Sequence, residues 1–266
     1  GDKDLRNFVM NVTWLRTKAT GQDNACLQQW KSGGYKGKGM SLIVTEAAAT
    51  SGSAPEGAPG VADFIHGFFS IAELGQFALM GVDMVARWSL TGGSGLITPP
   101  HPPHRSDWDA ASDLFLYALY NRTVGHGVLS VSGAESPTDR TPLMYAHCST
   151  YSNGSVTLLV ANPSATAVVV ALGGAHALPL LPRVEYVLTP HQGDISAHAP
   201  VLNGEQSTPL QVGKEDGTLP DMAGKWCGLE GCGRDGSWGS GGRMTLPAHS
   251  QSLIVLPYAR VGLCER

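Results

Sequence analysis

Apolar positions divide the chain into two regions of different periodicity. In the first region, two short apolar runs, 42–44 and 84–86, alternate with stretches in which apolar residues recur at helical spacing. The helical stretches lie at 5–15, 61–74 and 114–119. We expect the two runs to be buried parallel strands, because strands covered on both faces are apolar throughout. The third helix is expected to take its cap from Ser106 or Asp107.

From Gly127 onward, the helical spacing gives way to short runs typical of strands. These runs are VLSV, LMYAH, VTLLVAN, AVVVAL, VEYVL and SLIVLPY, separated by clusters of Gly, Pro, Asn and Asp. Such spacing is typical of an antiparallel β-sandwich. Residues 202–242 are rich in glycine and are expected to be loop-like. The pattern therefore predicts an α/β region, 1–126, and a β-sandwich domain, 127–266.

Two strand–helix units cannot close a parallel sheet by themselves. A (β/α)8 TIM barrel takes eight strands and about 250 residues. Left alone, the runs SLIVT and DMVARW would expose unpaired strand edges. We therefore expect another chain or segment to complete the barrel, plausibly the N-terminal part of the same precursor. The chain starts at Gly1 without a methionine, which predicts a processed or truncated polypeptide.

Composition and charge argue against several classes of partner. Of the 266 residues, 42% are hydrophobic and 15% are charged, which is typical of a globular protein. The net charge of −4 and the pI of about 6.1 provide no basic surface for nucleic acid. No stretch approaches the ~20 consecutive apolar residues of a membrane span.

Three glycosylation sequons and five cysteines favour a secreted protein, or one in a lysosome- or vacuole-like lumen. The sequon asparagines are Asn11, Asn121 and Asn153. Cys227 and Cys232 are close enough in sequence to bridge a glycine-rich loop, and Cys148 and Cys264 could join the start of a domain to its end. Cys26 is then free or paired with another chain.

Glu46 follows the first apolar run, in the stretch SLIVTEAAATSGSAPEGAPG. Two interpretations are open: a catalytic carboxylate at the mouth of a barrel, or an ordinary acidic residue that begins a loop. Barrel active sites lie at the C-terminal ends of strands, which is where Glu46 falls. Glu56, in the loop that follows, is interpreted as solvated.

Other motifs predict neither a metal site nor a cofactor. His101 and His104 stand in HPPH, where proline holds them off a helix face and no acidic or cysteine partner follows. The glycine loop 92–95 lacks the Lys-Ser/Thr of a phosphate-binding loop. No serine stands in a G-x-S-x-G frame, which argues against a serine hydrolase.

The order of these parts resembles the C-terminal portion of heparanase-like enzymes, glycoside hydrolase family 79. The matching pieces are IVTEAAATSGSAPEGAP, FIHGFFSIAELGQFALMGVDMVARWSLTGGSGLI, SDWDAASDLFLYALYNRTVGHGVL and YAHCST, with a closing Cys264. The resemblance is clearest over 41–131 and fades in 202–242. It implies a (β/α)8 barrel that carries a β-sandwich, and hydrolysis of polysaccharides or glycans with retention.

By this resemblance Glu46 is the nucleophile, and the acid/base glutamate lies on an earlier strand, in a segment absent from this sequence. The chemistry needs both groups, because an ionised oxygen attacks the anomeric carbon while a carboxylic acid protonates the leaving oxygen. Cys148 and Cys264 look like the pair that closes the family's β-domain. Cys26 would then reach the missing segment.

The resemblance also implies substrate-binding positions. These are Ser51, Gly52, Arg87, Trp88, Gly92 and Gly93. Relatives that bind glucuronides carry tyrosines behind the nucleophile and after the later glycine pair, and this chain has neither. Two aromatic hydroxyls that would hold a uronic acid carboxylate are therefore missing. The alternative function is a catalytically inactive, lectin-like protein that binds glycans on the same scaffold.

Overall fold

The computed structural model describes residues 41–47, 63–87, 90–91, 95–98, 108–131, 142–171, 182–204, 209–214, 216–228 and 243–265. The helix predicted at 5–15 lies outside the described residues.

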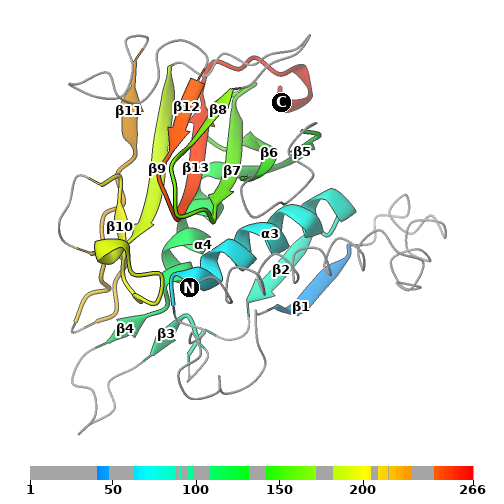
Figure 1. The fold of residues 1–266 in the computed structure, drawn as a ribbon. Coiled ribbons are helices and arrows are strands. Elements are labelled where there is room, and N and C mark those ends of the chain that lie inside the picture. The colour runs from blue at the N-terminus through cyan, green and yellow to red at the C-terminus, as the bar shows by residue number, and fades with distance from the viewer. Residues whose placement is uncertain are drawn as a thin grey trace, which may run out of the picture.

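The α/β region contains a strand–helix–strand unit. Strands β1 (Ile43–Ala47) and β2 (Met84–Arg87) pair in parallel, and helix α3 (Ile65–Met80) lies between them in sequence (Figure 1). The predictions of two buried runs and of a helix near 61–74 are confirmed in position. Both strands are only partly buried, because the described residues form just a two-stranded sheet here.

Glycine ends helix α3 and turns the chain into β2. Gly81 has φ 81°, a left-handed conformation that glycine adopts without strain. The Gly81 amide donates to the Ala78 carbonyl and the Val82 amide donates to the Phe77 carbonyl, which satisfies the last carbonyls of the helix. The start of β2 is thereby placed directly after the helix.

The third helix, α4 (Ser112–Thr123), follows a small hairpin of β3 (Ile97–Thr98) and β4 (Asp109–Ala110). The predicted cap is wrong: Ala111 is the N-cap, whereas Ser106 and Asp107 precede β4 and lie outside the described residues. Pairing of β4 with β3 holds residues 109–110 extended, so the helix begins only after them.

The remaining described strands form an antiparallel sheet of seven strands and a separate two-stranded ribbon. The sheet order is β10-β9-β13-β7-β6-β5, and β11 also pairs with β9. The bounds are β5 Val124–Leu129, β6 Leu143–Ser149, β7 Val156–Asn162, β9 Arg183–Pro190, β10 Pro200–Leu202, β11 Lys225–Cys227 and β13 Ser250–Leu256. The ribbon pairs β8 (Val168–Ala171) with β12 (Arg243–Leu246).

The large sheet is covered on both faces, which explains its apolar central strands (Figure 1). Side chains alternate between faces along a strand. Leu253 and Val255 of β13 join the core formed with α3 and α4. Ile254 and Leu256 join a second core beneath the β8–β12 ribbon. Every residue of β6, β7 and β13 is therefore buried.

The two predicted regions share one hydrophobic core. Apolar residues of α3 and α4 pack directly on those of the seven-stranded sheet. The predicted boundary between residues 126 and 127 falls inside β5, which continues directly from α4 and pairs with β6. Barrel completion and a full β-sandwich stay predictions. Within the described ranges, no helix is long and apolar enough to cross a membrane.

A disulfide joins Cys148 on β6 to Cys264 in the short 3-10 helix η3 (Gly262–Cys264), as expected for this pair. The two cysteines are 116 positions apart, so the bond connects the end of the chain to an inner strand of the sheet. Cys227 is also disulfide-bonded, and its expected partner Cys232 lies outside the described residues, as does Cys26.

Candidate active site

The C-terminal ends of β1 and β2 bring two predicted site residues to one edge. Glu46 is the fourth of the five residues of β1, and Arg87 is the last residue of β2. Ala47 of β1 pairs with Arg87 in the parallel register. Carboxyl ends of parallel strands are where barrel enzymes place their catalytic groups. Glu46 thus lies near the C-terminal end of β1, and its role as the nucleophile stays a prediction.

The register of β1 against β2 shifts at Glu46. Val44 pairs with Val85 and Ala47 pairs with Arg87, so Thr45 and Glu46 stand opposite Ala86 alone. This two-against-one arrangement is a β-bulge, which bends a strand and re-aims the side chains that follow. Bulges are over-represented next to active sites.

Behind this edge, Arg87 forms a buried ion pair with Asp113 of α4. The Arg87 Nε atom lies 3.0 Å from Asp113 Oδ2, and the two side chains are 6% and 1% exposed. Asp113 lies in the first turn of α4, where a helix favours a negative charge. Arg87 therefore connects the end of β2 to the start of α4, and its predicted contact with substrate stays a prediction.

A second buried carboxyl, Glu73 of α3, belongs to the same cluster. Burial raises the pKa of Glu73 to about 7, against the attraction of Arg87. Burial also raises the pKa of Asp113, while the Arg87 charge and hydrogen bond lower it. Oxygen atoms Glu73 Oε2 and Asp113 Oδ1 are buried and have no hydrogen-bond partner among the residues that the structure describes. One guanidinium thus faces two carboxyls, which favours keeping a proton on Glu73 near neutral pH.

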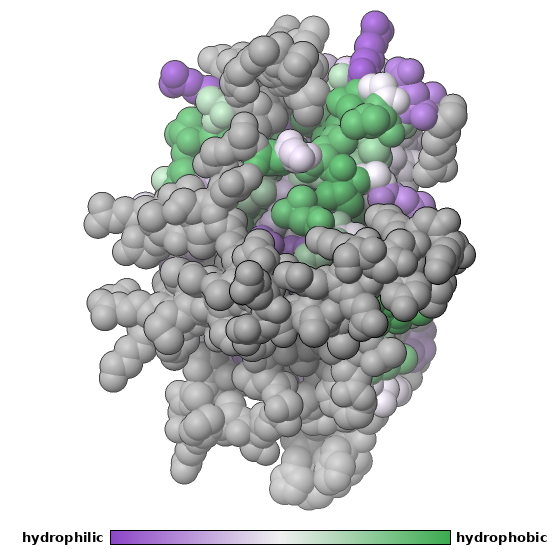
Figure 2. Space-filling model, turned by 90° about the vertical axis from the view of Figure 1, so that its right-hand side faces the viewer, coloured by the Kyte–Doolittle hydropathy of each residue, from purple (hydrophilic) through white to green (hydrophobic). Residues whose placement is uncertain are grey.

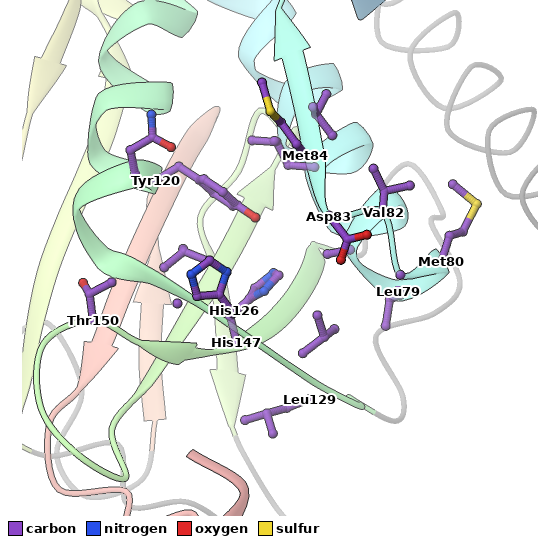
Figure 3. A pocket seen from close by; sticks show the side chains of 18 of the residues that line it. Leu79, Met80, Val82, Asp83, Met84, Tyr120, His126, Leu129, His147 and Thr150 are labelled. Carbon is purple, nitrogen blue, oxygen red and sulfur yellow. The ribbon is translucent and has the colours of Figure 1, made fainter. Parts of the chain in front are cut away.

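A large cavity lies at the other end of β2. It has a volume of about 1180 Å³ and is lined by the end of α3, the start of β2, the end of α4, and strands β5 and β6. Figure 3 shows Met80, Asp83 and Met84 on one side of it and Tyr120, His126 and His147 on the other. Figure 2 shows apolar side chains exposed in the upper half of this side of the molecule. A large pocket is the usual first candidate for an active site, but this one lies away from the strand ends that carry Glu46.

His147 is the buried polar group of this cavity. It is 1% exposed, and burial lowers the pKa of its imidazole to about 4, so it is neutral at physiological pH. Its Nε2 atom has no hydrogen-bond partner, and the Tyr120 ring meets the imidazole edge-on at 6.0 Å between centroids. Among the described residues, no carboxylate acts on the pKa of His147, so His147 is a poor candidate for a catalytic base.

Several predicted site residues lie outside the described residues. These are Asn11, Ser51, Gly52, Trp88, Gly92 and Gly93. Glu56, His101 and His104, for which no site role is predicted, also lie outside the described residues. Two predicted glycosylation sites are described, and both are exposed: Asn121 in α4 and Asn153 in the turn between β6 and β7. Among the described residues, no group of three or more His, Cys, Asp or Glu could hold a metal ion.

Sequence reasoning missed the buried cluster of Glu73 and Asp113. The signal was present at Glu73, which interrupts the apolar positions of a helix in the run SIAELGQF. A carboxylate at such a position is buried and needs a partner. Its partner Arg87 comes from a different element, so only the tertiary structure identifies the pair.

Known proteins relate the chain to glycoside hydrolases. Over 179 residues, 63% of this chain, the sequence is 30% identical to baicalin-β-D-glucuronidase of Scutellaria baicalensis. The match covers 32% of that protein, so the chain spans about a third of its length. No family model matches the sequence.

Solved structures with a similar arrangement include two glycoside hydrolases. The catalytic domain of GH30 xylanase C from Talaromyces cellulolyticus has a TM-score of 0.47 and 15% identity, over 81% of this chain and 40% of that chain. The GH51 α-L-arabinofuranosidase from Thermotoga petrophila RKU-1 has a TM-score of 0.48 and 14% identity, over 83% and 44%. The sequence match to the glucuronidase supports a glycoside-hydrolase relationship for this chain.

Proposed function

We propose that this chain is part of a retaining glycoside hydrolase of the heparanase-like type, in which Glu46 is the nucleophile. The observation that carries the proposal is the position of Glu46 at the C-terminal end of β1, in a parallel strand–helix–strand unit. The similarity to a β-glucuronidase supports the same reaction class.

In this mechanism the ionised Glu46 carboxylate attacks the anomeric carbon and forms a covalent glycosyl-enzyme. A protonated carboxyl about 5–5.5 Å away donates its proton to the leaving oxygen, and then activates the water that releases the sugar. Glu73 and Asp113 are poor candidates for that acid, because both are buried in the ion-pair cluster behind the strand ends. We propose that a segment outside this sequence supplies it.

We propose that this segment is the N-terminal part of the same precursor, present as a separate chain after processing and held in part through Cys26. The described α/β region supports an absent partner, because its two parallel strands leave apolar side chains open to solvent. Ile43 on β1 and Met84 on β2 are 49% and 55% exposed, and Leu90, which follows β2, is 63% exposed. Unpaired strand edges and exposed apolar side chains mark surfaces that another segment covers. The sequons favour secretion or a lumenal compartment.

The proposed substrates are glycans or polysaccharides, with β-glucuronides as the first class to test. The match to baicalin-β-D-glucuronidase favours glucuronides, whereas the missing tyrosines near Ser51 and after Gly93 favour a different sugar. The same missing tyrosines favour a lectin-like alternative, in which the scaffold binds glycans without hydrolysing them.

The test is Glu46→Gln in the full-length, assembled protein, with Glu56→Gln as the matched control in the following loop. We expect Glu46→Gln to abolish turnover of aryl β-glycosides while the melting temperature stays unchanged, and Glu56→Gln to remain active. A 2-fluoro glycoside should label the peptide that contains Glu46. Full turnover by Glu46→Gln would contradict the assignment. Glycan binding without hydrolysis by the wild-type protein would support the lectin alternative.

A further inference from the structure

His198 reaches from the loop before β10 to two acidic side chains of the α/β region. Its Nε2 atom lies 3.1 Å from Asp63 Oδ1, and its Nδ1 atom lies 3.4 Å from Asp109 Oδ2. Asp63 directly precedes α3, and Asp109 belongs to β4. The imidazole is 44% exposed, so solvent reaches this contact.

This geometry favours a protonated imidazole. An ionised carboxylate only accepts hydrogen bonds, so both ring nitrogens must donate at once. Only the imidazolium form carries two N–H groups. The hydrogen bond to Asp109, followed by that to Asp63, raises the pKa of His198 to about 9, against the effect of burial.

Backbone hydrogen bonds dock the same loop on the start of α3. The Phe64 amide donates to the Ala197 carbonyl at 2.9 Å, and the Ile65 amide donates to the Ile195 carbonyl at 3.0 Å. Helix α3 has no side-chain cap, so these carbonyls satisfy amides that a helix start leaves unpaired. The hydroxyl of Ser112, at the start of α4, donates to the Asp63 carbonyl at 2.9 Å.

The two carboxylates belong to the two connections that leave the candidate active site. Asp63 ends the connection from β1 to α3, and Asp109 lies on the connection from β2 to α4. In a barrel, such strand-to-helix connections surround the active site. In Figure 1 the start of α3, the β3–β4 hairpin and β10 lie toward the left-hand side of the molecule.

We propose that His198 is a positioning residue for the candidate active site: its imidazolium ties the connections after β1 and β2 to the β-sheet region and to each other. The inference rests on the proposed function, because the connections matter for catalysis only if Glu46 is the nucleophile. His198 itself touches no reacting group. It acts through Asp63, just before α3, and Asp109 on β4.

The charges around His198 set the direction of its pH dependence. Asp63 and Asp109 face it from the α/β region, and Asp194 on its own loop accepts from the Ser196 amide instead. Because the folded pKa lies above the ordinary value of 6.5, the contact is fully present below pH 6.5 and is lost as the pH rises through about 9.

The experiment compares His198→Gln, His198→Lys and Asp109→Asn in the full-length protein, with His191→Gln as the control on the same loop region. His198→Gln removes the cation, and His198→Lys keeps a cation that can donate to both carboxylates. We expect His198→Gln and Asp109→Asn to lower kcat/KM about tenfold at pH 6, because a small displacement of catalytic groups lowers the reaction rate steeply. His198→Lys should have a higher kcat/KM than His198→Gln, because it keeps the cation. The wild-type loss of activity near pH 9 should disappear in His198→Gln.

Hydrogen exchange of the amides of Phe64 and Ile65 provides a readout that does not depend on catalysis. We expect faster exchange in His198→Gln than in His191→Gln, and faster exchange in the wild type above pH 9. If Glu46→Gln keeps its activity but the amides of Phe64 and Ile65 exchange faster in His198→Gln, the proposed function fails. The inference that His198 holds the two connections together then still stands. Equal kcat/KM and equal exchange in His198→Gln and His191→Gln would overturn the inference.

Discussion

At the residue scale, the buried cluster of Glu73, Arg87 and Asp113 dominates the electrostatics behind the candidate active site. Two carboxyls, those of Glu73 and Asp113, face the single positive charge of Arg87. Removing one member of a buried ion pair leaves an uncompensated charge, which typically costs about 3–5 kcal/mol. The cluster therefore holds the end of β2 against α4 only while its charges balance.

Glu73→Gln should remove a pH-dependent cost of folding. The folded pKa of about 7 lies above the ordinary 4.5, so the wild-type protein loses stability as the pH rises from 4.5 to 7. At pH values above the folded pKa, this shift lowers the free energy of unfolding by about 3 kcal/mol. We expect the melting temperature of the variant to exceed that of the wild type at pH 8 and to match it at pH 4.5. Glu265→Gln, at an exposed carboxyl, should change neither value. A pH-independent difference would contradict the assignment.

At the element scale, two glycines let helix α3 approach the sheet. A Cβ atom at Gly67 would lie 2.1 Å from Gln251 Oε1 of β13, and one at Gly75 would lie 2.2 Å from the Tyr145 ring of β6. The Gln251 amide donates to the Phe64 carbonyl at 2.7 Å, and Gln76 donates to the Tyr145 hydroxyl at 3.0 Å. The close approach thus makes these buried hydrogen bonds possible.

Gly75→Ala should destabilise the protein, although alanine favours helices by about 1 kcal/mol over glycine. The added methyl group would overlap the Tyr145 ring and displace it from Gln76, and such overpacking typically costs about 1–3 kcal/mol. Gly262→Ala is the control, because no atom lies within 4 Å of the position of its new Cβ. Urea unfolding of both variants measures the difference. A more stable Gly75→Ala protein would show that the helix does not pack this closely.

At the scale of the whole molecule, the disulfide between Cys148 and Cys264 closes the sheet region. It spans 116 positions and fixes the end of the chain beside β6. A long closed loop restricts the unfolded chain, and loss of a native disulfide commonly costs about 2–5 kcal/mol. The bond therefore stabilises the core beneath the β8–β12 ribbon, to which both cysteines belong.

The double variant Cys148→Ala, Cys264→Ala should unfold at a lower temperature than the wild type, because it loses the stability that the disulfide contributes. Reductant should lower the wild-type melting temperature toward that of the variant, and should change the variant less, since the variant lacks the Cys148–Cys264 bond. Equal melting temperatures of wild type and variant without reductant would contradict a stabilising role.

Sequence periodicity alone predicted the local elements well. Short runs rich in apolar residues predicted the positions of β1, β2, β6, β7, β9 and β13. Every residue of β6, β7 and β13 is buried, as expected for strands covered on both faces, whereas β1 and β2 are only partly buried. The short strands β10, β11 and β12 were not predicted, since three or four residues beside glycine-rich loops carry too little periodicity. The cap of α4 was misplaced because pairing of β4 with β3 overrides the preference of Ser106 and Asp107 for helix starts.

The sequence by itself determined the order of strands and helices and the position of Glu46 directly after an apolar run. Both follow from local periodicity, which the chain carries regardless of its neighbours. Only the tertiary structure decided that Arg87 pairs with Asp113, that Glu73 is buried beside them, and that His198 contacts Asp63 and Asp109. Arg87 and Asp113 are 26 positions apart, and His198 and Asp63 are 135 positions apart. The partners belong to different elements, so burial and charge balance in the folded chain decide these contacts.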